Sequence, residues 1–80
     1  MNINDAIRER IRELCAEREI TPNALSYICG VSQSTIKSIL NRESNSPKVE
    51  TIKKLCDGLE ITIVQFFDTE GFNSLEQEIK

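Results

Sequence analysis

Two short segments of helical periodicity, residues 22–29 and 33–40, stand only three residues apart, and this spacing restricts the fold more than any other feature of the chain. The first segment opens on a Thr-Pro pair. Thr can cap a helix, and Pro suits the first helical position because its missing N–H would have no partner there. Gly30 follows the segment, and glycine readily adopts the left-handed conformation that ends a helix. Because Ser32 is a natural cap for the second segment, the sequence predicts two short helices joined by a tight turn.

Apolar spacing elsewhere predicts three further helices and leaves a sixth open, which makes the chain all-α. The expected bounds are about 5–18 for the first helix, with Asn4 and Asp5 as its cap and first-turn acid, about 48–58 for the fourth, and a short fifth from Thr62. A marginal sixth helix is suggested by three apolar residues at helical spacing, Phe72, Leu75 and Ile79. The side chains expected on the inner faces are Ile7, Ile11, Leu14, Cys15, Leu25, Ser26, Ile28, Cys29, Ile36, Ile39, Leu40, Val49, Ile52, Leu55, Cys56, Leu59, Val64, Phe66 and Phe67.

The length of 80 residues gives room for one domain with one modest core. We expect a compact five-helix bundle over residues 1–68 and an acidic tail over residues 69–80, which is helical if the sixth helix forms. The sequence does not open on a basic region followed by an apolar run. No stretch approaches the roughly 20 apolar residues that span a bilayer. The expected location is therefore the cytoplasm, with no membrane partner.

Cysteine and histidine usage argues against a metal site and against a disulfide framework. The three cysteines, Cys15, Cys29 and Cys56, are odd in number, widely spaced and never arranged as C-x-x-C, so we expect them to be small buried hydrophobes. The chain has no histidine, and therefore no imidazole for metal binding or general base catalysis. No pair of nucleophile and base and no phosphate-binding loop is visible. We expect no cofactor, no small-molecule ligand and no enzymatic activity.

The charge of the chain is unevenly distributed. The formal net charge is −3, which taken alone speaks against a nucleic-acid partner. Residues 33–54, however, carry five basic and two acidic side chains, whereas residues 1–32 have a net charge of −1 and residues 55–80 a net charge of −5. The basic residues of the central segment are Lys37, Arg42, Lys48, Lys53 and Lys54. A local basic patch of this kind attracts a phosphate backbone, although the last two lysines can equally serve to solvate the fourth helix.

Two short helices joined by a tight turn form the helix-turn-helix unit, whose second helix enters the major groove of DNA. The outer face of residues 33–40 is polar, short-chained and almost free of acid. Gln pairs bidentately with adenine, Ser bonds to donors or acceptors of either strand, and Lys reaches a guanine edge or a phosphate. The same composition is also ordinary for a solvated helix, and helical geometry alone does not separate the two interpretations. The candidate residues are Gln33, Ser34, Lys37 and Ser38, with Thr35 near the boundary of the face.

A longer pattern adds to this interpretation. The stretch I-T-P-N-A-L-S-Y-I-C-G-V-S-Q-S-T-I at residues 20–36 is followed by Asn41-Arg42, by Pro47, by residues 51–59 and by Phe66-Phe67. With these residues, the chain over positions 7–68 resembles the Cro/C1-type helix-turn-helix domain of the lambda- and 434-repressor-like regulators, also called the XRE family. The resemblance implies a lambda-repressor-like bundle. It also implies sequence-specific binding of double-stranded DNA by a prokaryotic or phage transcription regulator such as a repressor, and leaves open whether binding represses or activates.

Carried over position by position, the resemblance also implies site residues. The implied base contacts come from Gln33, Ser34 and Ser38, with Lys37 as a further candidate. The implied phosphate contacts come from Thr21, Thr35, Asn41, Arg42 and Lys48. One departure concerns Pro22, because the family commonly places at this position a Gln that clamps a phosphate. The N–H groups and positive dipole end of the helix would then hold that phosphate alone, and we expect weaker non-specific affinity.

Assembly, one aromatic residue and an alternative function stay open at this point. A homodimer on half-sites about one helical turn apart is the usual geometry of the motif. Its surface could be the fifth helix or the Phe72/Leu75/Ile79 stripe, although the stripe can equally fold back on its own core. Tyr27 can pack its ring or reach a phosphate or water with its hydroxyl. The alternative function is an antitoxin-like or adaptor module that uses the acidic C-terminal third to bind a basic partner.

Overall fold

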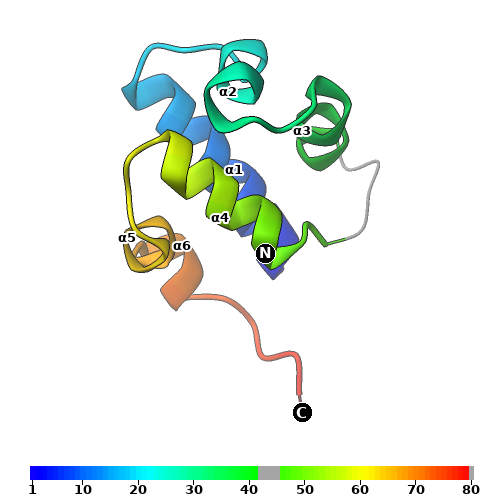
Figure 1. The fold of residues 1–80 in the computed structure, drawn as a ribbon. Helices are drawn as coiled ribbons and strands as arrows, with labels where there is room; N and C mark the ends of the chain where they lie inside the picture. The colour runs from blue at the N-terminus through cyan, green and yellow to red at the C-terminus, as the bar shows by residue number, and fades with distance from the viewer. Residues whose placement is uncertain (42–45, 80) are drawn as a thin grey trace.

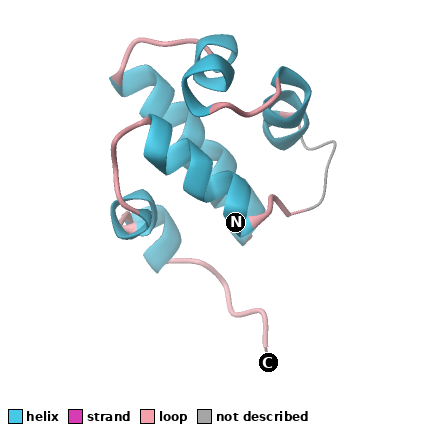
Figure 2. Ribbon diagram, in the orientation of Figure 1, coloured by secondary structure: helices cyan, strands magenta, loops and turns pink. Residues whose placement is uncertain are grey.

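The structure is a computed structural model that describes residues 1–41 and 46–79. Within these residues every regular element is a helix, as predicted (Figure 2). The six helices of this part of the chain are α1 (Ile3–Glu17), α2 (Pro22–Cys29), α3 (Gln33–Leu40), α4 (Val49–Gly58), α5 (Ile63–Phe67) and α6 (Glu70–Asn73). None of the helices in the described ranges is both long and apolar enough to cross a membrane.

The helix α2 holds the bundle together. It packs against α1, α3 and α4, while α5 packs against α4 and α6 packs against α1 (Figure 1). The buried core is built from apolar side chains of α1 to α5 and of the residue that ends α4, namely Ile7, Ile11, Leu14, Cys15, Leu25, Cys29, Ile36, Ile39, Leu40, Ile52, Leu55, Cys56, Leu59 and Phe66. Removing this apolar surface from water is the main force that holds the short helices in place. Because α3 buries its inner face here, its opposite face is fixed toward solvent.

The turn between α2 and α3 has the chemistry that the sequence predicts. The Thr21 hydroxyl accepts a hydrogen bond from the Ala24 N–H at 3.1 Å at the start of α2. Gly30 ends this helix at φ 66°, in the left-handed region where a side chain is disfavoured. The Ser32 hydroxyl then accepts from the Thr35 N–H at 3.2 Å and caps α3. The predicted bounds of these two helices are confirmed.

Three side chains predicted to lie in the core are instead exposed. Ile28 of α2 is 50% exposed, because the buried side of this two-turn helix is centred on Leu25 and Cys29 and about 100° of rotation separates successive residues. Val49 is the first residue of α4 and is 73% exposed. Val64 is 75% exposed because it lies two residues from the buried Phe66, on the opposite side of α5. The core prediction is wrong at these positions.

Both ends of the chain differ in detail from the predicted bounds. The helix α1 begins two residues earlier than expected, because the Asn2 side chain accepts from the Asp5 N–H at 2.9 Å. The possible sixth helix is present only as the single turn α6. Its Phe72 is half-buried against the core, but Leu75 lies after the helix and Ile79 is 88% exposed. The segment after α6 runs away from α3 (Figure 1). A domain boundary after residue 68 stays a prediction.

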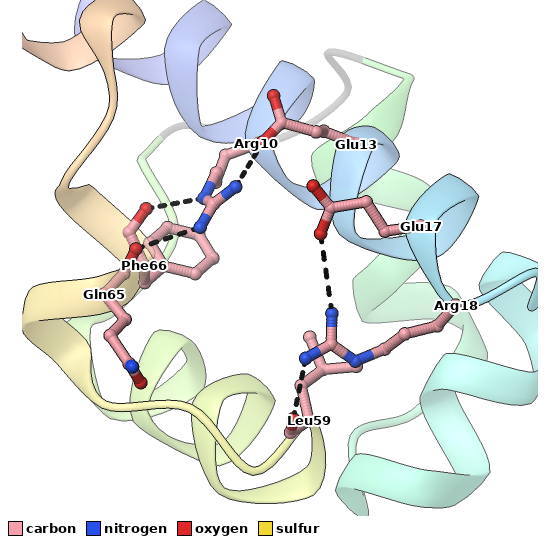
Figure 3. A network of polar contacts seen from close by, with 7 residues as sticks. All are labelled: Arg10, Glu13, Glu17, Arg18, Leu59, Gln65 and Phe66. Atoms are coloured by element: carbon pink, nitrogen blue, oxygen red, sulfur yellow. Dashed lines mark hydrogen bonds and ion pairs between the residues drawn. The ribbon is translucent and has the colours of Figure 1, made fainter.

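Arg10 of α1 and Arg18, the residue that caps the end of this helix, bind backbone carbonyls near the C-terminal ends of other helices (Figure 3). The Arg10 guanidinium donates from Nε to the Phe66 carbonyl at 2.7 Å and from Nη2 to the Gln65 carbonyl at 2.9 Å, at the end of α5. Arg18 donates from Nη2 to the Leu59 carbonyl at 3.0 Å, at the end of α4. A cation at this end of a helix donates to carbonyls that lack intrahelical partners, and it interacts favourably with the negative end of the helix dipole. These bonds tie the second half of the bundle to α1.

Candidate nucleic-acid interface

The outward face of α3 lies between two open hollows of the surface. The first, which we call the α2–α3 hollow, has a volume of about 720 Å³. Its lining residues are Arg12, Pro22, Asn23, Gln33, Ser34, Ile36, Lys37, Leu40 and Asn41. The hollow therefore joins the start of α2 to one whole side of α3. Cationic and amide side chains gather in it without any acidic residue among those that line it.

The second hollow lies on the other side of α3, and we call it the α3–α4 hollow. It has a volume of about 380 Å³. Its lining residues are Ser34, Thr35, Ser38, Ile39, Ser46, Pro47, Lys48 and Thr51. Hydroxyl groups dominate this side, and Lys48 supplies a positive charge just before α4. The polar side chains of α3 thus point into concave surface on both flanks of the helix.

The predicted base-contacting residues all belong to this face. Gln33, Ser34 and Lys37 are exposed, and Ser38 is half-buried. Ser34 lines both hollows, whereas Gln33 and Lys37 line the first and Ser38 lines the second. The structure therefore brings the four residues together on the outward face of α3, between the two hollows. No described segment of the chain covers them, since the C-terminal residues lie on the far side of the bundle (Figure 1).

Three of the predicted backbone-contacting residues lie at the rim of this face. Asn41 lines the α2–α3 hollow, and Thr35 and Lys48 line the α3–α4 hollow. Thr21 precedes Pro22 at the start of α2 and is exposed. Arg42 lies outside the described residues, so its predicted phosphate contact stays a prediction.

The hydroxyl groups at the start of α3 are linked to one another. The Ser32 Oγ lies 2.8 Å from the Thr35 Oγ1 and 3.2 Å from the Ser34 Oγ. Each hydroxyl carries one donor and two acceptor sites. With the bond from the Thr35 N–H, all three sites of Ser32 are used, whereas Ser34 and Thr35 each keep unused sites. Ser34 and Thr35 can therefore keep the cap of α3 intact and still hydrogen-bond a base edge or a phosphate.

The start of α2 keeps a free hydroxyl donor despite the proline at its first position. Thr21 uses a hydroxyl lone pair for the Ala24 N–H, which leaves its own O–H free to donate to an anion. The N–H groups of the first turn and the positive end of the dipole point the same way. Pro22 contributes no N–H, and Asn23 beside it lines the α2–α3 hollow. The phosphate contact predicted for this helix start stays a prediction.

The lysines divide into a paired and an unpaired group. Within α4, Lys53 donates to Asp57 and Lys54 lies 3.6 Å from Glu50, so these side chains form i,i+4 pairs on a solvated helix face. The bond to Asp57 raises the pKa of Lys53. Lys37 forms no ion pair with another described residue, and the same is true of Lys48 within the described ranges. The positive charge available to a ligand is therefore concentrated beside α3.

Arg12 joins the residues beside α3, although no motif of the sequence singles it out. Its Nη2 donates to the carbonyl of Leu40, the last residue of α3, at 2.9 Å. The guanidinium lines the α2–α3 hollow and has further N–H donors. Only the packing of α1 near the end of α3 reveals this role, because Arg12 and Leu40 are 28 positions apart in the sequence.

Tyr27 takes the solvent-facing alternative of the two that the sequence left open. Its side chain is 79% exposed on the outer side of α2. Its hydroxyl accepts a hydrogen bond from the Gln33 Nε2 at 3.2 Å, across the turn that joins the two helices. The exposed Tyr27 therefore contacts a predicted base-reading residue directly.

The three cysteines are buried, as the sequence predicts. Burial raises the pKa of the Cys29 thiol to about 11, with the neighbouring Cys15 and Cys56 adding to the effect. The Cys29 Sγ donates to the Leu55 carbonyl at 3.6 Å. A neutral, buried thiol is a poor nucleophile and a poor metal ligand. Among residues 1–41 and 46–79, no group of three acidic or thiol side chains could hold a metal ion.

Comparison with known proteins agrees with this geometry. Residues 10–71 match the family model of the Cro/C1-type HTH DNA-binding domain. The chain is 40% identical over 73 residues to the uncharacterized HTH-type transcriptional regulator RghRB of Bacillus subtilis (strain 168), covering 90% of this chain and 52% of that protein. It is 40% identical over 57 residues to the HTH-type transcriptional repressor RghR of the same organism, covering 71% of this chain and 42% of that protein. The chain thus spans about half the length of these curated relatives.

A solved structure resembles the fold over almost its whole length. The crystal structure of the prophage Lp1 protein 11 superposes with a TM-score of 0.81 at 29% sequence identity. The match covers 94% of this chain and 100% of that chain. The arrangement of helices that positions α3 is therefore shared with this protein.

Proposed function

From the premise that this chain belongs to the Cro/C1-type helix-turn-helix DNA-binding family, we propose that it places α3 in the major groove of duplex DNA. In this role it acts in a transcription regulator that recognises a specific operator. The observation that carries the proposal is the open polar face of α3, which has a hollow on each side. Beside it lie Lys37 and Lys48, which form no ion pair with another described residue. A major groove about 12 Å wide admits a helix in this orientation.

The proposed contacts divide by the position of each side chain. Gln33, Ser34, Lys37 and Ser38 lie on the helix that enters the groove, so they contact base edges. The rim of this face contacts the backbone through Thr21, Thr35, Asn41 and Lys48, together with the newly identified Arg12. Base contacts specify the sequence, while rim contacts fix the register of the protein on the duplex.

We also propose that two copies bind two half-sites about one helical turn apart. The exposed side of α5 supports this, because Val64 is 75% exposed and Ile63 is 38% exposed on a helix that does not form the DNA face. The stripe weighed from the sequence supports a dimer less, since Phe72 packs on its own core. Sedimentation of the protein with and without duplex DNA measures this stoichiometry.

The salt dependence of binding tests the proposed function. An operator duplex, selected from a random pool, should bind with an affinity that falls steeply as the salt concentration rises. A plot of the logarithm of affinity against the logarithm of salt concentration should fall by about 0.9 for each neutralised phosphate. If no duplex binds at about 50 mM salt, or if binding is indifferent to salt, the adaptor alternative is favoured. In that alternative the acidic residues 55–80 would bind a basic protein instead.

We expect Arg12→Gln to lower the salt slope by about one, because one phosphate contact is lost. The matched control is Arg18→Gln. It removes the same charge and a similar bond to a helix-end carbonyl, at the end of α4 instead of α3. The control should keep the wild-type slope. Equal slopes for the two variants would remove Arg12 from the interface.

A further inference from the structure

The exposed pair of Tyr27 and Gln33 carries an inference that rests on the proposed function and deepens it. The two residues lie on different helices of the helix-turn-helix unit, six positions apart. The Gln33 amide donates one N–H to the Tyr27 hydroxyl at 3.2 Å. Tyr27 is 79% exposed, so its ring contributes little to the core. The main contact that the structure gives its hydroxyl is this bond to the first residue of α3.

The bond changes what the amide can offer to a base. A Gln side chain has two N–H donors and one carbonyl acceptor. With one N–H directed to Tyr27, the amide presents one donor and one acceptor to the groove. The structure directs the Gln33 Nε2, and not the carbonyl oxygen, toward the Tyr27 hydroxyl.

This reduced set of groups matches one purine and not the other. In the major groove adenine presents the N7 acceptor and the N6 donor, which one N–H and one carbonyl satisfy together. Guanine presents two acceptors, N7 and O6, so a bidentate contact with it requires both N–H groups of the amide. An amide that has already given one N–H to Tyr27 would place its carbonyl against the guanine O6.

We propose that Tyr27 is a specificity-determining positioning residue, which restricts Gln33 to adenine and disfavours guanine at one base pair of the operator. Tyr27 acts through Gln33 and needs no contact with that base. The restriction is present before DNA binds, so part of the cost of ordering the Gln33 side chain is met in the free protein.

The test compares the base preferences of four proteins, namely wild type, Tyr27→Phe, Gln33→Ala and the double variant. Their affinities are measured for the selected operator duplex and for duplexes with each purine at the position that loses preference in Gln33→Ala. Tyr27→Phe removes only a hydroxyl from an exposed ring, so the fold is retained. We expect it to lower the adenine-over-guanine preference at that position by about three- to tenfold, the worth of one hydrogen bond. In the Gln33→Ala background the same change should have no effect there.

Three results would overturn the proposal. Tyr27→Phe could leave the purine preference unchanged, or act equally in the Gln33→Ala background. It could also weaken all duplexes alike without changing base preference, which would make the hydroxyl a phosphate contact. Ser38→Ala, on the same face of α3, is the matched control and should alter preference at a different base pair only.

A measurement without DNA separates this proposal from the proposed function. In the free protein, Tyr27→Phe should shift the NMR signals of the Gln33 side-chain amide, while Ser38→Ala leaves them in place. If wild type binds no duplex, both proposals fail whatever the amide signals show. If wild type binds duplex specifically, but Tyr27→Phe changes neither the amide signals nor the purine preference, only the proposed role of Tyr27 is wrong.

Discussion

Replacing Phe66 with Ala should lower the free energy of unfolding by about 3–5 kcal/mol. Phe66 is fully buried, and its ring lies 4.9 Å from that of Phe67 and 6.1 Å from that of Phe72. Truncation removes one member of this aromatic cluster and leaves a cavity. A domain of this size has a stability of about 4–12 kcal/mol, so the loss is a large part of the total. Urea denaturation followed by circular dichroism measures it.

The matched control for this prediction is Val64→Ala on the same helix. Val64 is 75% exposed, so its truncation should change stability by no more than about 0.5 kcal/mol. Phe66→Leu refills most of the space and should fall between the two. A loss below 1 kcal/mol for Phe66→Ala would mean that α5 does not pack against the core in the way described.

Gly58→Ala should destabilise the protein by about 1–3 kcal/mol, because it forces apart the two helices that hold the bundle together. A Cβ at Gly58 would lie 2.4 Å from the Cys29 Sγ and 2.9 Å from the Cys29 Cα. The thiol is confined in the core, and the Cα belongs to the backbone of α2. The substitution therefore displaces α2 relative to α4, and with it the turn that leads to α3. The midpoint temperature of thermal unfolding and the affinity for duplex DNA should both decrease.

Two comparisons make this prediction specific. Gly71→Ala should be nearly neutral by the same measurements, since its Cβ would meet only the Thr69 Oγ1 at 3.8 Å. Adding Cys29→Ala to Gly58→Ala removes the Sγ contact but keeps the backbone contact, so it should restore part of the stability. If Gly58→Ala changed neither the unfolding temperature nor the duplex affinity, the close approach of α2 and α4 would be contradicted.

The sequence was sufficient for the elements whose local signals agree. The Thr-Pro start, the left-handed Gly30 and the Ser32 cap fix α2 and α3 almost independently of the rest of the chain. Side-chain direction was less predictable in short helices. Ile28 and Val64 sit on helices of eight and five residues, where apolar periodicity has too few turns to define a buried face.

The tertiary contacts of long polar side chains could not be predicted from the sequence. Arg10, Arg12 and Arg18 each bind a carbonyl that lies 28 or more positions further along the chain, and nothing local marks their partners. The same reason left Tyr27 undecided, because its contact with Gln33 depends on the angle at which α3 leaves the turn. The face of α3 itself was predictable, since a cap and three buried residues set its orientation.

Selection of bound sequences from a random duplex pool, carried out in parallel with wild type and Gln33→Ala, tests the role of α3 most directly. We expect wild type to enrich a two-fold symmetric consensus. The variant should lose preference at one base pair of each half-site, with a cost of about 1–3 kcal/mol on the wild-type site. Identical enrichment by the two proteins, or no enrichment by wild type, would contradict the placement of this helix in the major groove.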